Sequence, residues 1–378
     1  MLKRGLFILV AALALAACQK ESGFSVKTGE SGGYTYEYVT NDPLKVRVYT
    51  LKNGLKVYLS RYEGEPRVYT MIPVRAGGKN DPANNTGLAH YLEHIMFKGT
   101  ASFGSLDWEK EKVYLDSIEQ MFNQYARLKD EKEREAYYKL IDQVSNEASK
   151  FAIANEYDKM ISEIGGTGTN AFTWVDQTVY INDIPSNQLD NWLQIEANRF
   201  RMITPRLFHT ELEAVYEEKN RSLDNDYWKT YESLFSGTFP THPYGTQTVI
   251  GTIDHLKNPS ITEIKTYFDT YYRPNNVAIC LSGELDYDKT IAMIDKYFGD
   301  WQPNDQLPEW KKVNEAPIQK PVVKEVIGPD AEWVHIGFRH EGRTSEDYQK
   351  LRLLDMILSN SQAGLIDLNL KQQQKVLE

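Results

Sequence analysis

One short stretch organises this chain: residues 86–97, which read Thr-Gly-Leu-Ala-His-Tyr-Leu-Glu-His-Ile-Met-Phe. The Asn-Asn-Thr-Gly run at 84–87 is turn and N-cap chemistry, of the kind that begins a helix. Apolar side chains then recur at helical spacing, which predicts a short amphipathic helix with one buried face. The residues of that face are Leu88, Leu92, Ile95 and Met96.

The other side of this helix carries His90, Glu93 and His94. Residues four apart lie one turn above each other, so the two imidazoles can reach one point, with Glu93 close to the same side. Two neutral imidazoles supply half of a tetrahedral zinc shell, and a catalytic zinc takes three protein ligands and a water. Glu93 is placed to accept a proton from that water. The order His-x-x-Glu-His is the inverzincin signature, which predicts one Zn²⁺ per chain. The alternative is a chance motif around a pair of core histidines.

Three further histidines compete as metal ligands: His209, His242 and His255. Each is expected to be a surface or structural histidine, because none belongs to a recognisable ligand motif.

The N-terminus has the features of a bacterial lipoprotein signal peptide. Residues 1–17 combine a charged start with a short apolar run, and they end in Leu-Ala-Ala before Cys18. The sequence therefore predicts lipidation of Cys18, with residues 18–45 as a tether between the lipid and the fold. The alternative is a plain signal peptide that happens to contain a cysteine. Lipidation would put the protein in the cell envelope, at the outer membrane, facing the periplasm or the surface.

Composition excludes some classes of function. The net charge is −10, which argues against nucleic-acid binding and against a polybasic membrane surface. The chain has two cysteines, so once Cys18 carries lipid no intrachain disulfide can form. Stability must come from a hydrophobic core, for which 41% hydrophobic residues is an ordinary content.

Periodicity predicts strands and helices along most of the chain. Residues 46–60 alternate around Asn53-Gly54, which is typical of a hairpin with a type I′ turn. Further strands are expected at 67–75, 169–174, 178–181, 277–283, 322–326 and 333–338, and helices at 187–202, 208–223, 260–272, 287–298 and 348–360. Residues 105–163 are highly charged with a 3.5-residue apolar period, which predicts an inserted helical hairpin. A Pro-rich polar stretch from 308 to about 320 predicts a linker.

Several motifs make the chain resemble the pitrilysin family of zinc peptidases (M16), which includes insulin-degrading enzyme and the mitochondrial processing peptidases. The resemblance covers nearly everything from Val46 onward. It rests on the histidine motif followed by Phe97-Lys98-Gly99-Thr100, and then on Gly165-Gly166, Asn170-Ala171-Phe172-Thr173, Asp176, Thr178-x-Tyr180, Glu211-(x)6-Glu218, His242-Pro243-Tyr244-Gly245, residues 271–276 and Gly283.

The resemblance implies roles for residues outside the histidine motif. Glu218 would be the third zinc ligand, and Glu211, two turns earlier on the same face, would support catalysis at the site. Glu217 could be confused with Glu218, but it faces about 100° away on a helix. The edge-strand residues Asn170, Ala171, Phe172 and Thr173 would bind substrate through the backbone.

The implied fold is α+β, a mostly antiparallel sheet flanked by helices, with the helical hairpin inserted. Residues 46–310 would be the zinc-bearing half, with its C-terminal segment from about 259. Residues 311–378 would be the linker and the start of a second half without metal. The chain ends inside a predicted helix, so it is expected to be the N-terminal piece of a longer protein. The second half would lie in that longer chain or in a partner subunit.

The sequence thus favours a zinc metalloendopeptidase acting on peptides or unfolded polypeptides. One alternative is a catalytically silent family member that serves as a binding or assembly subunit. Another is a metal-free lipoprotein interaction module, in which the motif is accidental.

Overall fold

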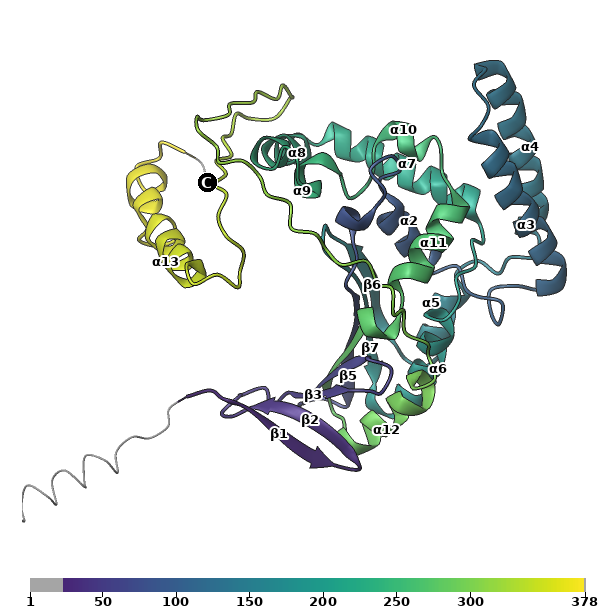
Figure 1. Cartoon of the computed structure of the whole chain (residues 1–378), viewed down its shortest axis with the longest axis horizontal. Helices are drawn as coiled ribbons and strands as arrows, with labels where there is room; N and C mark the ends of the chain where they lie inside the picture. Colours follow the sequence, from purple (N-terminus) through teal and green to yellow (C-terminus); the bar gives the residue numbers. More distant parts are fainter. Residues whose placement is uncertain (1–22, 377–378) are drawn as a thin grey trace, which may run out of the picture.

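The computed structural model describes residues 23–376, and these form a mixed sheet covered by helices (Figure 1). The strands are β1 (Val26–Ser31), β2 (Tyr34–Val39), β3 (Arg47–Thr50), β4 (Lys56–Arg61), β5 (Arg67–Val74), β6 (Thr167–Thr173), β7 (Thr178–Pro185) and β8 (Ala278–Gly283). The helices are α2 (Leu88–Ile95), α3 (Trp108–Tyr125), α4 (Glu131–Ser149), α5 (Glu156–Glu163), α6 (Leu189–Arg199), α7 (Phe208–Asp224), α8 (Asp226–Thr238), α9 (Pro243–Thr246), α10 (Ile253–Leu256), α11 (Ile261–Tyr271), α12 (Tyr287–Phe298) and α13 (Tyr348–Leu358).

The sheet has the order β1-β2-β3-β4-β8-β5-β7-β6. Every neighbouring pair is antiparallel except β4 and β8, which run parallel from Lys56 beside Ala278 to Arg61 beside Gly283. The predicted α+β class, a mostly antiparallel sheet flanked by helices, is therefore confirmed. Strands β1 and β6 are the two edges of the sheet.

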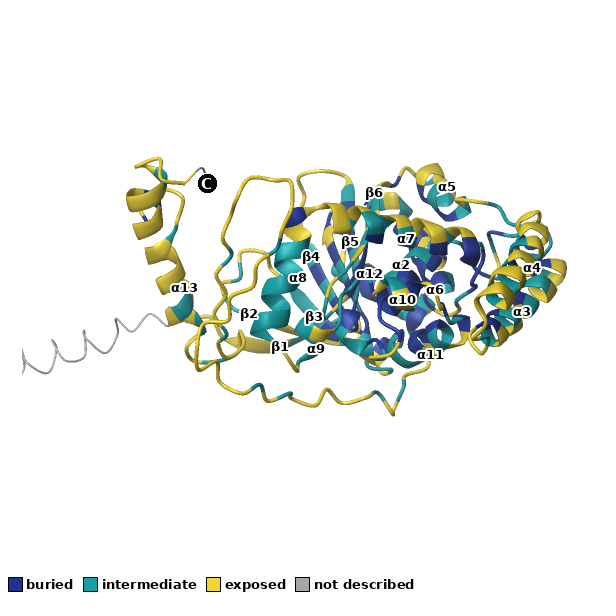
Figure 2. Cartoon of the chain, turned by 90° about the horizontal axis from the view of Figure 1, so that it is seen from above, coloured by how far each residue is buried: buried dark blue, intermediate teal, exposed yellow. Residues whose placement is uncertain are grey.

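The core lies between one face of the sheet and the helices that pack on it (Figures 1 and 2). Alternate side chains of the central strands point into this core, as the period of two requires. Helix α2 packs against α7, α11 and the strands β6 and β7, so the predicted metal helix sits deep in the helical layer. Buried side chains of the central strands include Val57, Leu59, Val68, Ile72, Ile279 and Leu281.

The predicted helical insert is present as α3, α4 and α5. Helices α3 and α4 pack against each other as a hairpin that projects from the body of the molecule (Figure 1). Its base is held by a fully buried ion pair, in which Arg206 donates to both carboxylate oxygens of Glu111 at 2.6 and 2.8 Å. Because α3 also contacts α11 and α4 contacts α7, the insert is fixed to the helical layer.

Two parts of the chain differ from the predictions. Residues 26–39, assigned to a tether, form the β1–β2 hairpin, because β2 pairs with β3 and extends the sheet. Residues 322–326 and 333–338, predicted as strands, have no strand pairing in the structure. They are irregular chain in which Val323 and Val334 are more than four-fifths exposed, and neither segment lies in the eight-stranded sheet. No helix within residues 23–376 is both long and apolar enough to cross a membrane.

Candidate metal centre

Helix α2 begins at a close contact that sequence reasoning did not identify. Gly87 has φ 92°, and a Cβ on it would lie 2.9 Å from the carbonyl oxygen of Ile250, so only glycine fits there. The carboxylate of buried Asp81 accepts hydrogen bonds from the backbone N–H groups of Gly87 (2.7 Å) and Ala89 (3.0 Å). Burial raises the pKa of Asp81 to about 8, although these backbone donors lower it. Gly87, the last residue of the predicted 84–87 run, is the N-cap residue, and Asp81 supplies the side-chain hydrogen bonds that a glycine cannot.

The structure brings His90, His94 and Glu218 together. Glu218 Oε2 lies 3.4 Å from His90 Nε2 and 3.6 Å from His94 Nε2. One potential ligand atom from each residue falls within 4.8 Å of the others, and within residues 23–376 no other group of three His, Cys, Asp or Glu residues meets this spacing. The histidines come from α2 and the glutamate from α7, which packs against it.

Burial and charge act differently on the two imidazoles. Burial lowers the pKa of His90 to about 4, and the positive charge of His94 adds to this effect. Burial also acts to lower the pKa of His94, but hydrogen bonds to Glu211 and Glu218 outweigh it and raise the pKa to about 9. A hydrogen bond from His94 holds the pKa of Glu218 below its usual value. Burial therefore favours the neutral form of the His90 imidazole, whereas the carboxylates of Glu211 and Glu218 favour the protonated form of the His94 imidazole.

Glu211 lies next to the cluster and contacts Nδ1 of His94, whereas the other ring nitrogen, Nε2, faces Glu218. Its Oε2 lies 3.4 Å from His94 Nδ1, and its Oε1 forms an ion pair with Lys98 Nζ at 2.7 Å. Burial acts to raise the pKa of Glu211, but the bonds from His94 and Lys98 outweigh it and lower the pKa. Glu211 therefore helps to fix the orientation of the His94 ring, and the ion pair with Lys98 favours the charged form of Glu211.

Glu93 points toward the sheet. Thr173, the last residue of β6, donates a hydrogen bond from Oγ1 to Glu93 Oε2 at 2.5 Å. Burial raises the pKa of Glu93 and outweighs the hydrogen bond from Thr173 and the charge of His94, which both lower it, while the charge of Glu218 adds to the rise. A carboxylate with a raised pKa, anchored at one oxygen, is suited to take up and release a proton.

Strand β6 ends beside this carboxylate and is one of the two edges of the sheet. The backbone N–H of Trp174 donates to the carbonyl of Gln177 at 2.8 Å, which makes these two residues a hydrogen-bonded pair. Antiparallel pairs alternate, so the polar backbone groups of Ala171 and Thr173 face the open edge. The side chain of Phe172 is 40% exposed. An extended peptide could pair with this edge.

The remaining predicted residues lie elsewhere. Glu217 is exposed and accepts a hydrogen bond from Asn220, away from the cluster. His255 bonds Thr86 at the start of α2, His242 caps α9, and His209 lies in a second cluster near the helical insert. Cys18 and residues 1–17, the predicted signal peptide, lie outside the described residues. Sequence reasoning missed Asp81, the bond from Thr173 to Glu93 and the Lys98–Glu211 pair, since their partners are not adjacent in the sequence.

The donor set fits zinc. Two imidazole nitrogens and one carboxylate oxygen are the ligand types of a catalytic zinc, with a fourth position left for water or substrate. The histidine Nδ1 of His94 meets a carboxylate, which is the usual support for a zinc-bound imidazole. His90 Nδ1 is buried without a hydrogen-bond partner among the described residues. Both imidazoles offer Nε2 to the common point.

Two family profiles match the sequence. Residues 56–113, which contain the histidine motif, match the profile described as Insulinase (Peptidase family M16). Residues 260–376 match the profile described as Peptidase M16 inactive domain.

Curated relatives and solved structures agree with these matches. Zinc protease PqqE of Helicobacter pylori is 24% identical over 331 residues, which are 83% of this chain and 61% of that protein. Insulin-degrading enzyme of Homo sapiens is 24% identical over 301 residues, which are 76% of this chain and 24% of that protein. The chain therefore spans less than two thirds of the length of either relative.

Among solved structures, a protease from Helicobacter pylori matches with a TM-score of 0.53 and 24% identity, covering 70% of this chain and 53% of that one. The first half of the periplasmic protease PqqL from Escherichia coli matches with a TM-score of 0.55 and 18% identity, covering 74% of this chain and 51% of that one. These structures share the fold described above.

Proposed function

The chain belongs to the M16 family of peptidases, and from this premise we propose that it is a zinc-dependent endopeptidase that hydrolyses peptides or unfolded polypeptides. The observation that carries the proposal is the convergence of His90, His94 and Glu218 beside a carboxylate, Glu93, that is tied to a free sheet edge. Metal ligands, a base and a peptide-binding strand are the parts that such a reaction needs.

His90, His94 and Glu218 would hold the zinc ion. When bound, zinc supplies Lewis-acid polarisation of the peptide carbonyl and lowers the pKa of water to about 7. Glu211 keeps the His94 ring oriented, with its own charge maintained by Lys98. This support leaves the Nε2 atoms of both histidines directed at the metal position.

Glu93 would act as the general base and then as the general acid. Its Oε2 accepts the hydrogen bond from Thr173, so Oε1 is the oxygen that takes a proton from the attacking water. The same oxygen then gives the proton to the nitrogen of the leaving amine. The raised pKa of Glu93 favours the first of these transfers, because a more basic carboxylate takes up the proton of the water more readily.

Substrate would lie along β6 as an added antiparallel strand. The outward backbone groups of Ala171 and Thr173 are free to pair with it, and Asn170 and Phe172 lie between them on the strand. Because Thr173 also bonds Glu93, the strand that holds the peptide is joined directly to the base. This connection would place the scissile bond within reach of the carboxylate.

Location and assembly belong to the same proposal. The predicted lipidation of Cys18 and the likeness to a protease described as periplasmic support a place in the cell envelope, with the lipid in the membrane. The relatives are longer than this chain, which supports a second half that closes over the substrate, supplied in the same chain or by a partner subunit.

A silent binding or assembly subunit is the second candidate. The match of residues 260–376 to a profile named as an inactive domain favours it. The intact Glu93 and its bond to Thr173 favour the peptidase, since a subunit that only binds needs no base.

The Glu93→Gln variant tests the proposal. The amide keeps the shape of the side chain but cannot take a proton, so zinc should stay bound while peptide turnover falls by about 10²–10⁴-fold. Zinc is measured by elemental analysis and turnover with a set of quenched fluorescent peptides. Glu217→Gln, an exposed change on α7, is the control and should behave as wild type. Unchanged turnover in zinc-loaded Glu93→Gln would refute the assignment, and a zinc-bound wild type that cleaves no peptide would favour the silent subunit.

A further inference from the structure

The turn between β6 and β7 is held by side chains that the proposed mechanism does not use. Asp176, in this turn, forms an ion pair through Oδ1 with Lys79 of the 3₁₀ helix η1 (Gly78–Asn80). The hydroxyl of Tyr244, on α9, donates a hydrogen bond to Asp176 Oδ2 at 2.7 Å. Both oxygens of this carboxylate therefore have a partner, and three segments that are far apart in the sequence meet there.

The main chain of the same turn is held as well. The backbone N–H groups of Gly78 and Lys79 donate to the carbonyl oxygens of Trp174 and Val175, each at 3.0 Å. The two segments lie so close that a Cβ on Gly77 would be 2.1 Å from the carbonyl oxygen of Trp174. The turn is thus attached to its neighbours at its backbone as well as at its carboxylate.

This turn begins directly after Thr173, the residue whose hydroxyl bonds Glu93. The hairpin loop is tight, because the backbone N–H of Trp174 donates to the carbonyl of Gln177 at 2.8 Å. A displacement of Asp176 in so short a loop also displaces Thr173 at its base. A functional side chain keeps its geometry only when the residues around it fix its position. The contacts of Asp176 therefore act on the position of the Thr173 hydroxyl.

The hydrogen bond from Tyr244 is the stronger of the two side-chain restraints on Asp176. The ion pair with Lys79 has one half-exposed partner, since the Asp176 side chain is 43% exposed, and such pairs contribute little. Burial, together with the hydrogen bond to Asp176, raises the pKa of Tyr244, so its hydroxyl stays a donor. The ring of Trp310 lies 4.6 Å from Lys79 Nζ and covers the ammonium group.

We propose that Tyr244 is a positioning residue for the peptidase reaction: with Lys79 it holds Asp176, and through the β6–β7 turn it keeps the Thr173 hydroxyl on the base Glu93. The inference rests on the proposed function for its effect on the rate. Tyr244 acts on the base through the turn, because its hydroxyl bonds Asp176 while Thr173 bonds Glu93.

A double-mutant cycle on kcat tests this path. Tyr244→Phe keeps the ring and removes the hydroxyl, so kcat should fall roughly 2–10-fold, the range that one hydrogen bond contributes, with KM and zinc content unchanged. Thr173→Val removes the bond to Glu93 itself. In the Thr173→Val protein, Tyr244→Phe should cause no further loss, since the link that it acts through is already gone. Losses that multiply in the double variant would overturn the proposal.

The molecule contains a matched control. Tyr297 donates to Asp190 at 2.9 Å, and Lys296 Nζ lies 3.4 Å from the same aspartate, so α6 and α12 carry a second Lys–Asp–Tyr set. Tyr297→Phe removes the same kind of bond without affecting the β6–β7 turn, and kcat should stay as in wild type. An equal fall of kcat in Tyr297→Phe and Tyr244→Phe would indicate a general loss of stability and would overturn the proposal.

The conservative variant of Asp176 gives a second check. Asp176→Asn keeps an acceptor oxygen for the Tyr244 hydroxyl and loses the charge, whereas Asp176→Ala loses both partners. The asparagine variant should therefore retain more of the wild-type kcat than the alanine variant. Equal kcat values for the two variants would show that the bond from Tyr244 does not matter for the rate.

Amide hydrogen exchange separates this inference from the proposed function. It is measured on the zinc-loaded full chain without peptide, so it needs no turnover. Exchange in residues 174–178 should be faster in Tyr244→Phe than in wild type and unchanged in Tyr297→Phe. Unaltered exchange in this turn would overturn the positioning role even in an active peptidase. A zinc-loaded wild type that cleaves no peptide would instead refute the proposed function, and the exchange result would still decide whether Tyr244 holds the turn.

Discussion

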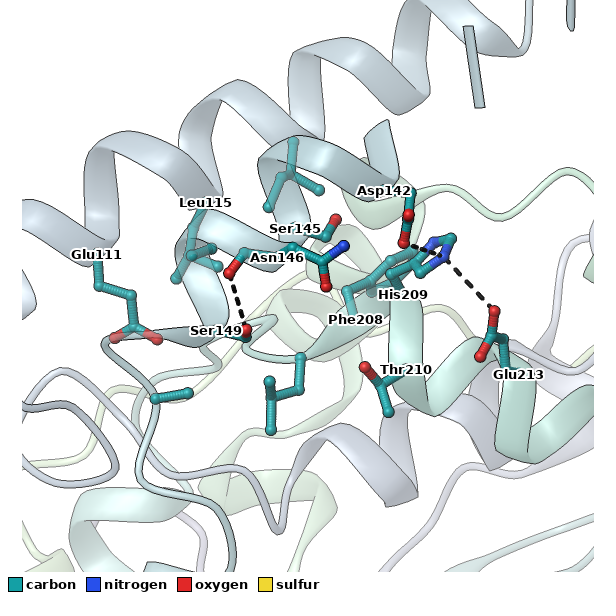
Figure 3. Close-up of a pocket in the computed structure, with 14 residues that line it drawn as sticks. Glu111, Leu115, Asp142, Ser145, Asn146, Ser149, Phe208, His209, Thr210 and Glu213 are labelled. Carbon is teal, nitrogen blue, oxygen red and sulfur yellow. Dashed lines mark hydrogen bonds and ion pairs between the residues drawn. The ribbon is translucent and has the colours of Figure 1, made fainter. Parts of the chain in front are cut away.

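Helix α7 contributes residues to two clusters of histidine and carboxylate side chains. The distances between histidine nitrogens and carboxylate oxygens are similar in the two clusters, but the residues around them differ. In both, histidine Nε2 atoms lie 3.4 and 3.6 Å from carboxylate oxygens. The cluster of His90, His94 and Glu218 draws two imidazoles from α2, and Glu211 supports one of them. The cluster of His209 has one imidazole and two half-exposed carboxylates from α4 and α7 (Figure 3).

The difference between the clusters is what lies beside the ligands. Next to the first are a buried carboxylate, Glu93, and the free edge of β6, which Thr173 joins together. Next to the second are a small cavity and the helices of the insert. Similar distances between donor atoms therefore do not identify a function by themselves, whereas a base and a peptide-binding edge beside the first cluster indicate a reaction. We expect chemistry at the first cluster.

The largest expected effect comes from Glu218→Ala. A zinc site with four protein ligands is worth about 10–16 kcal/mol, so one ligand carries roughly 3–4 kcal/mol, or about 10²–10³ in affinity. Zinc titration should show this loss, with peptide turnover lost at ordinary zinc concentrations. Glu217→Ala is the matched control on the next residue and should change neither. If both changes weaken zinc equally, the third ligand is a different residue.

Glu211→Gln should have a smaller effect, which sharpens the distinction between a ligand and its support. The amide can still accept a bond from His94 Nδ1 but loses the charge that Lys98 balances. Zinc affinity should fall by about 10–100-fold, as for other residues that orient a metal ligand. Turnover should return when excess zinc is added. Loss of turnover at saturating zinc would instead mean that Glu211 takes part in the reaction itself.

Ala171→Pro should have the smallest effect, and the effect should be on substrate binding beside the first cluster. Proline removes one outward N–H from the edge of β6, and a typical hydrogen bond contributes about 0.5–1.5 kcal/mol. The KM for a peptide should therefore rise by roughly 2–10-fold with zinc content unchanged. Ala171→Gly keeps the N–H and serves as the control. Equal KM values for the two variants would show that peptides do not pair with this edge.

Local patterns were enough to predict most elements of the fold. The alternation around Asn53-Gly54 produces β3 and β4, and the 3.5-residue period of the insert produces α3 and α4. The tether and the late strands were mispredicted for opposite reasons. A polar, tyrosine-rich segment became β1 and β2 because β3 offered it an edge. The apolar segments 322–326 and 333–338 found no strand to pair with in the described chain.

The sequence by itself determined that His90, Glu93 and His94 share one helix and nearly one face, because residues three or four apart lie about one turn above each other on an α-helix. It could not relate that helix to Glu218, which only family resemblance suggested, or to Thr173 and Asp81. These contacts join residues between 8 and 128 positions apart, and they depend on how α2, α7 and β6 pack. Periodicity reports which side of an element is buried, whereas the partner that buries it is chosen by the tertiary fold.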